Sequence, residues 1–314
     1  MPDEFETIAR LFRPLATAPE ARGLADDVAV LPSRPGLDLV LTKDAVVDGV
    51  HFLPDDPPDL VARKLLRVNL SDLAAKGAQP FGYLLAVAWP ERFGWKARAA
   101  FAHGLEQDQA AYGLSLLGGD TVSTPGPFTA SATLLGWAPQ GRVPSRAGAQ
   151  PGDRLFVTGT VGDGWLGLQA AQGGLERLGR EAVDILTMRY RLPEPRLDLG
   201  PAIAEVATAT ADVSDGLLAD AAHIASASGV RLELALEAAP LSPEAAAWLA
   251  GEDALEGRLA LCTGGDDYQI LFTAPPGRAP EGTTPIGRVV QGEGLAVTYQ
   301  DRPVQPDRLG WRHA

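Results

Sequence analysis

Apolar and polar positions in the first half of the chain alternate between a strand pattern and a helix pattern. A short apolar run predicts a strand at 38–42, and Leu65, Val68 and Leu73 share one face of a helix predicted over 58–77. The remaining elements expected in this half are a strand at 81–89, a helix at 95–112 and strands at 114–117 and 128–137. Strands and helices therefore follow one another in turn.

The second half repeats this alternation after a polar stretch rich in Gly and Pro at 146–153, which is typical of a domain boundary. The elements expected after it are a strand at 154–158, helices near 164–171, 181–191, 201–208 and 217–226, and a strand at 230–236. Alternation in both halves predicts an α/β or α+β fold with two domains, 1–148 and 149–314.

Composition agrees with two folded domains and excludes one class of partner. The 314 residues are 46% hydrophobic and 21% charged, which is ordinary for a globular protein. Lys and Arg number 27 against 40 Asp and Glu, so the net charge is −13. Because such a chain repels phosphate backbones, we expect no nucleic-acid partner.

The cysteine count and the apolar runs bear on location. A single cysteine, Cys262, allows no disulfide within the chain. The acidic start has no apolar stretch of the kind that secretion signals carry, and the longest apolar run, near 81–89, is far shorter than the roughly 20 residues of a membrane span. We therefore expect a cytoplasmic protein with no membrane partner.

Asp residues recur beside Gly or at strand ends, while Asp72 lies within a predicted helix. The segments concerned are 26–27, 44, 118–120, 212–216 and 264–267. Carboxylates suit Mg²⁺, which often links them to substrate phosphates, and Gly lets backbone N–H groups approach a phosphate. Each segment taken alone also fits a plain turn or helix cap, and Asp72 fits an ion pair with Lys76. Spacing alone leaves these alternatives open.

A second motif, G-x-G-x-x-G at 162–167, fits dinucleotide binding or close packing of a strand against a helix. Packing is favoured, because Trp165 would crowd a pyrophosphate and the acids about 20 residues on lie in a stretch that looks helical. The P-loop, H-E-x-x-H, C-x-x-C and G-x-S-x-G patterns are absent from the sequence.

Taken in order, several segments resemble the thiamine-monophosphate kinase family, which belongs with aminoimidazole ribonucleotide synthetase and selenophosphate synthetase. They are 44–52 (DAVVDGVHF), 68–78 (VNLSDLAAKGA), 118–121 (GGDT), 157–160 (VTGT), 212–217 (DVSDGL), 264–268 (GGDDY) and the closing Gly310-Trp311. The resemblance implies an ATP- and Mg²⁺-dependent kinase that converts thiamine monophosphate to thiamine diphosphate by direct in-line transfer. It also implies a homodimer in which N-terminal mixed-sheet domains pair.

Roles follow from the same resemblance. The resemblance implies no catalytic base. It implies metal binding by Asp27, Thr42, Asp44, Asp72, Asp120, Asp212 and Asp215. It also implies ATP binding by Gly119, Asp120, Arg146 and Ser214, and thiamine-phosphate binding by His51, Asp266 and Trp311. Lys43 stands where the family usually has Thr, within a Ser/Thr-Thr-Asp pattern, so we expect its ammonium to point away from the metal site or to replace part of one Mg²⁺. Two alternatives are another ATP-dependent activating enzyme of this superfamily and a non-catalytic Mg²⁺-nucleotide-binding protein.

Overall fold

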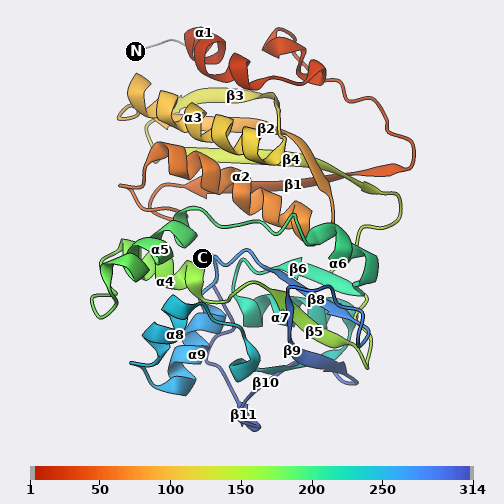
Figure 1. Ribbon diagram of the computed structural model, residues 1–314. Coiled ribbons are helices and arrows are strands. Elements are labelled where there is room, and N and C mark those ends of the chain that lie inside the picture. Colours follow the sequence, from red (N-terminus) through yellow and green to blue (C-terminus); the bar gives the residue numbers. More distant parts are fainter. Residues whose placement is uncertain (1–3, 312–314) are drawn as a thin grey trace. The chain divides into compact units, whose positions relative to one another are not determined.

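The computed structural model describes residues 4–311 and divides the chain into two units (Figure 1). The first unit comprises Met1–Leu73 and Ala78–Gly141, and the second comprises Ala74–Gly77 and Arg142–Ala314. Each unit is built around a mixed β-sheet with helices. The predicted α/β (α+β) class is therefore confirmed.

The first unit has a four-stranded sheet in the order β1-β4-β2-β3. Its strands are β1 (Leu37–Val47), β2 (Gln79–Pro90), β3 (Leu116–Thr124) and β4 (Thr129–Pro139). Only the β2–β3 pair among these is parallel. The helices α2 (Pro58–Ala75) and α3 (Trp95–Tyr112) lie on one face of this sheet (Figure 1). On that face Trp89 packs against Phe101 and Phe128, with ring centroids 5.5 and 5.3 Å away.

The opposite face of this sheet is only partly covered. Side chains alternate along β1, so Leu37, Leu39 and Leu41 are exposed while Val46 is buried. The N-terminal segment packs on part of this face through Ala21, which joins a cluster with Leu117 and Leu135. This segment consists of the short helical turns α1 (Glu4–Thr7), η1 (Ile8–Phe12), η2 (Arg13–Leu15) and η3 (Pro19–Leu24).

The second unit has a seven-stranded mixed sheet in the order β11-β10-β7-β9-β5-β8-β6. Its strands are β5 (Arg154–Thr158), β6 (Ala209–Asp212), β7 (Arg231–Ala235), β8 (Ile270–Ala274), β9 (Thr283–Val290), β10 (Gly294–Tyr299) and β11 (Arg302–Val304). Its helices are α4 (Asp163–Ala171), α5 (Arg180–Arg191), α6 (Gly200–Val206), α7 (Leu217–Ser228), η4 (Leu236–Ala238), α8 (Pro243–Leu249) and α9 (Ala254–Thr263). Apolar residues of α7, including Leu217 and Ile224, are fully buried against this sheet.

Most predicted elements exist close to their expected bounds, and α3 and β5 match them at both ends. One expectation is wrong in a way that affects the site. The strand predicted at 114–117 begins at Leu116 and runs on to Thr124, so Gly119 and Asp120 lie inside β3 and not in a turn after it. Glycine is uncommon within strands, so its presence at 118–119 suggested a turn. Across 4–311, no helix is both long enough and apolar enough to cross a membrane.

Candidate active site

Three of the predicted metal ligands meet on the helix-covered face of the first unit. Thr42 and Asp44 lie two residues apart on β1, so their side chains point to the same side of the sheet. Asp72 of α2 faces them and accepts a hydrogen bond from the Thr42 hydroxyl. Asn69, one turn earlier on α2, accepts a hydrogen bond from the backbone N–H of Asp44 at 3.0 Å. Strand and helix are thus joined at the carboxylates.

This arrangement changes the acidity of Asp44. Burial, together with the neighbouring charge of Asp72, raises the pKa of Asp44 to about 6. The side chain of Lys43 points to the opposite face, where its Nζ donates to Ser131 Oγ at 2.7 Å. Lys43 therefore points away from Asp44 and Asp72, and its ammonium does not relieve the repulsion between these two carboxylates. A hydroxyl and two close carboxylates form an oxygen donor set suited to Mg²⁺.

A second group surrounds a cavity of about 370 Å³ in the first unit. Asp27, Gly119 and Asp120 line it, together with apolar side chains of the N-terminal segment and of β2 and β3. Both carboxylates are exposed. At Gly119 an added Cβ would lie 1.8 Å from the carbonyl oxygen of Leu85, so a side chain at this position would force β3 away from β2.

The two groups of the first unit lie on opposite faces of its sheet. Thr121 points to the helix-covered face, where its hydroxyl accepts from Trp89 Nε1 at 2.7 Å, so its neighbour Asp120 points the other way. Asp44 is on the helix-covered face, and β1 and β3 are the two edges of the sheet. Within one copy of the unit, therefore, Asp44 and Asp72 do not share a metal site with Asp120.

His51 closes the turn that follows β1. Its backbone N–H donates to the carbonyl of Val47 at 2.9 Å, and its Nδ1 accepts from the N–H of Val47 at 3.1 Å. Because Nδ1 is an acceptor here, the neutral imidazole carries its proton on Nε2. This tautomer presents an N–H donor, which suits a phosphate oxygen.

In the second unit, four predicted residues from three distant segments come together. The backbone N–H of Asp266 donates to the carbonyl of Ser214 at 2.9 Å, and the N–H of Trp311 donates to the carbonyl of Asp215 at 2.8 Å. An added Cβ at Gly265 would lie 2.6 Å from the Ser214 carbonyl, so only glycine allows this approach. Loop 213–216, loop 264–268 and the closing segment therefore form one surface.

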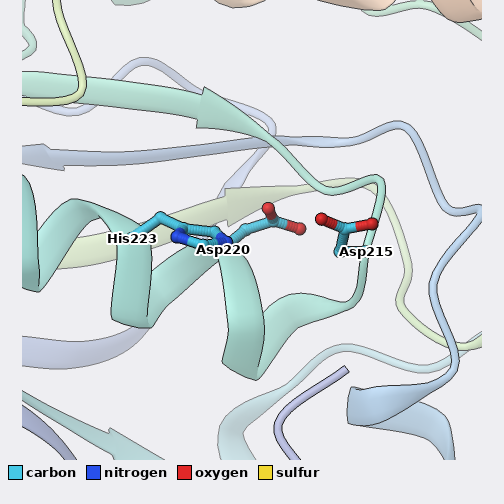
Figure 2. A group of neighbouring side chains, drawn as sticks. All are labelled: Asp215, Asp220 and His223. Carbon is cyan, nitrogen blue, oxygen red and sulfur yellow. The ribbon is translucent and has the colours of Figure 1, made fainter. Parts of the chain in front are cut away.

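The start of α7 adds two side chains to this surface that the sequence analysis did not single out. Figure 2 shows Asp215 in the loop before α7, with Asp220 and His223 on the helix, and ligand atoms of the three lie within 4.8 Å of one another. Burial and the charge of Asp215 raise the pKa of Asp220 to about 7, although the charge of Arg146 lowers it. Asp220 also accepts from the N–H of Ser214 at 3.1 Å.

Comparisons with known proteins identify the family over almost the whole chain. Residues 25–138 match the family model "AIR synthase related protein, N-terminal domain", and residues 150–300 match the corresponding C-terminal domain. The chain is 54% identical to the thiamine-monophosphate kinase of Caulobacter vibrioides, over 99% of this chain and 91% of that protein. The chain belongs to the thiamine-monophosphate kinase family.

Solved structures of the thiamine-monophosphate kinase family share the fold. One is the enzyme from Stenotrophomonas maltophilia K279a, with a TM-score of 0.79 and 34% identity, covering 90% of this chain and 91% of that one. Another, described as AaThiL complexed with AMPPCP and TMP, has a TM-score of 0.81 and 33% identity, covering 99% of this chain and 97% of that one.

The glycine motif at 162–167 serves packing in this family member, as expected. An added Cβ at Gly164 would lie 2.1 Å from the carbonyl oxygen of Asp266, and one at Gly167 would lie 2.2 Å from that of Leu186. The N–H groups of Gly162 and Gly164, which would face a pyrophosphate in a dinucleotide fold, are bound by the carboxylate of Asp267. These glycines bring α4 against the loop that carries Asp266.

Asp212 lies at the end of β6, opposite Ile270 of β8, and is buried. Asp267 is buried as well, and burial raises its pKa to about 8 even though two backbone N–H groups lower it. The sequence analysis placed Asp267 in a motif but gave it no role. The signal available was its position next to Asp266 in a glycine-flanked loop.

Proposed function

We propose that this protein transfers the γ-phosphoryl group of ATP to thiamine monophosphate and so forms thiamine diphosphate. Likeness to thiamine-monophosphate kinases along almost the full chain supports this function, as does the fold shared with the AaThiL complex of AMPPCP and TMP. The observation within this chain that carries the proposal is the pair of close carboxylates, Asp44 and Asp72, beside the Thr42 hydroxyl. Two carboxylates this close are stabilised by a bound divalent cation, and kinases use such cations for phosphoryl transfer.

No catalytic base is proposed, because the acceptor needs none. Thiamine monophosphate is a phosphate monoester, and the second pKa of such esters is near 6, so its oxygen is largely ionised at pH 7. The transfer is therefore a direct in-line attack on ATP without a phosphoenzyme. The main obstacle is repulsion between two anions, and the protein's task is to position them and offset their charge.

The chain's carboxylates fit Mg²⁺. We assign metal binding to Asp27, Thr42, Asp44, Asp72, Asp120, Asp212 and Asp215. Burial of Asp44 near Asp72 raises its pKa, so a divalent cation would stabilise the ionised form of both groups. When bound, Mg²⁺ supplies charge neutralisation for the phosphate oxygens. Thr42 and Asn69 hold the two carboxylates in place through the side-chain and backbone contacts of β1 and α2.

Substrate contacts are assigned from the family motifs and fit the local chemistry. For ATP they are Gly119, Asp120, Arg146 and Ser214, and for thiamine monophosphate they are His51, Asp266 and Trp311. Arg146 is an exposed cation suited to a phosphate. Trp311 is 54% exposed, so the face of its indole is available to a thiazolium cation.

The partly covered face of the first unit supports a homodimer. Leu37, Leu39 and Leu41 line β1 on that face, and Leu84 and Val122 are exposed on β2 and β3. Exposed apolar patches of this kind mark protein interfaces. A second copy seated here would bury them.

The remaining assignments concern the domains and the location. Residues 1–148 form the domain that binds ATP and Mg²⁺ and makes the dimer, and residues 149–314 form the C-terminal α/β domain. A cytoplasmic location stays a prediction, and it agrees with a buried free thiol at Cys262.

The decisive experiment combines the purified protein with ATP, MgCl₂ and thiamine monophosphate and follows thiamine diphosphate by chromatography. We expect product to form in proportion to ADP, and no product when Mg²⁺ is chelated. A folded protein that binds ATP without making thiamine diphosphate would refute the function and favour a non-catalytic nucleotide-binding protein.

A further inference from the structure

The loop that carries Asp266 has an unusual backbone. Asp266 has a φ of 63° and Tyr268 has a φ of 52°, both in the left-handed region that residues other than glycine seldom adopt. Gly265, which precedes Asp266 directly, has a φ of 78°. Backbone conformations of this kind persist only where the surroundings hold them in place, and they cluster at functional sites. The contacts that hold this loop therefore matter for Asp266.

The side chain of Asp267 hydrogen-bonds this loop to the start of α4. Asp267 is 7% exposed. Its Oδ2 accepts a hydrogen bond from the N–H of Gly162 at 2.8 Å, and its Oδ1 accepts one from the N–H of Gly164 at 3.0 Å. Both oxygens are thus used by backbone donors that the first turn of a helix leaves without partners.

The loop is also attached on its other side, where it meets the segment after β6. The N–H of Asp266 donates to Ser214 at 2.9 Å, and the N–H of Tyr268 donates to Val213 at 2.7 Å. The hydroxyl of Tyr268 donates to Asp266 Oδ1 at 3.0 Å. These bonds fix the direction of the Asp266 carboxylate relative to the loop, while Asp267 fixes the loop relative to α4.

We propose that Asp267 is a positioning residue, which holds the Asp266 loop against the start of α4 so that the Asp266 carboxylate meets the thiamine phosphate substrate. The inference rests on the proposed function for the contact of Asp266 with substrate. Asp267 itself is buried, and both of its oxygens accept hydrogen bonds from backbone N–H groups. Its removal therefore affects substrate binding through the placement of its neighbour.

Replacement by asparagine tests this role without a change in size. An amide has a single acceptor oxygen, so Asp267→Asn keeps one of the two bonds and sets an NH₂ group against the second N–H donor. Asp267→Ala removes both bonds. The matched control is Asp153→Asn in the same unit, where Asp153 is 6% exposed and accepts from Gln150 N and Thr208 Oγ1 at 2.9 and 2.7 Å. Asp153 contacts none of the assigned site residues in these bonds.

Two measurements apply to each variant: steady-state kinetics with both substrates, and hydrogen exchange of the peptides that contain 160–168 and 262–270. We expect Asp267→Asn to raise KM for thiamine monophosphate by about tenfold or more, with a smaller change in KM for ATP, because displacement of a binding group by about 1 Å can cost up to about a hundredfold. Hydrogen exchange should become faster in both peptides. The increase in exchange rate and in KM should be larger for Asp267→Ala than for Asp267→Asn. Asp153→Asn should lower thermal stability and leave both readouts near wild type.

Three results would overturn the proposal. The first is an unchanged KM for thiamine monophosphate in Asp267→Asn, and the second is unchanged exchange in the two peptides. The third is an Asp267→Asn chain that fails to fold, because Asp267 would then support the whole unit and not this loop. If the wild-type protein makes no thiamine diphosphate, the proposed function fails, and the exchange data alone decide whether Asp267 holds the loop.

Discussion

Gly164→Ala adds a single methyl group where α4 meets the Asp266 loop. The new Cβ would lie 2.1 Å from the carbonyl oxygen of Asp266 and 2.4 Å from its carbonyl carbon, whereas ordinary contact begins at 3.4 Å. Helix and loop must therefore separate by more than 1 Å. Overpacking of this kind costs about 1–3 kcal/mol, and the better helix propensity of alanine offsets up to about 1 kcal/mol. The net loss of stability should be modest.

The effect on binding should be larger than the effect on stability. Displacement of Asp266 by this distance should raise KM for thiamine monophosphate by about tenfold to a hundredfold. The assay is steady-state kinetics at a temperature well below the melting point, with the melting temperature measured in parallel. A raised KM in a folded variant is the expected outcome.

Gly179→Ala is the matched control for this substitution. Gly179 precedes α5 in the same unit, has an ordinary φ of −62°, and has no heavy atom within 4 Å of an added Cβ. Because Gly179 is the N-cap of α5, where alanine is less favourable than glycine, its replacement should cost about 1 kcal/mol and leave KM unchanged. If Gly164→Ala and Gly179→Ala behave alike in both measurements, the reasoning from the close approach of α4 to Asp266 is wrong.

Three further predictions concern the metal ligands and the dimer. Asp72→Asn should lower turnover by orders of magnitude in a folded protein, whereas Glu91→Gln, at an exposed position, should not; equal activity in the kinase assay would refute the metal assignment. The folded-state pKa of Asp44, about 6, lies above its ordinary value of 3.8, so ionisation of Asp44 in the metal-free protein removes stability as the pH rises from about 4 through 6. Asp44→Asn should therefore raise the free energy of unfolding of the metal-free protein at pH 7.5 by up to about 3 kcal/mol, seen as a higher melting temperature, and should not raise it at pH 4. Leu41→Lys places a charge on the exposed face of β1 and should shift the protein from dimer to monomer in sedimentation; a dimer of unchanged strength would contradict the proposed interface.

Local patterns predicted the elements of this fold well. The helix over 95–112 and the strand over 154–158 occur with the predicted bounds, because each has a clear period and turn signals at its ends. The packing role of the glycines at 162–167 was also predictable, since Trp165 argued against a bound pyrophosphate. The sequence analysis left the direction of Lys43 open, and in the structure Lys43 points to the face opposite its neighbours Thr42 and Asp44, as alternation along a strand requires.

The sequence could not show which acidic side chains lie close together in the folded protein. Thr42 and Asp72 are 30 residues apart, and their contact depends on how α2 packs on β1. Asp220 looked like an ordinary residue in the first turn of a helix, and only its burial beside Asp215 gives it an altered pKa. Long-range packing decides burial, and burial decides the acidity of a carboxylate, so no local motif contains this information.

The separation of acids into distinct groups also gives the net charge of −13 a physical meaning. Scattered surface carboxylates would repel one another weakly and keep ordinary acidity. Instead, Asp44 lies beside Asp72, and Asp220 beside Asp215, and in both pairs burial and the neighbouring charge raise a pKa. Repulsion between such carboxylates destabilises the metal-free folded protein, and a bound cation removes this repulsion. Carboxylates placed in this way suit a bound cation, so part of the surplus of negative charge lies in these two groups and not in scattered surface residues.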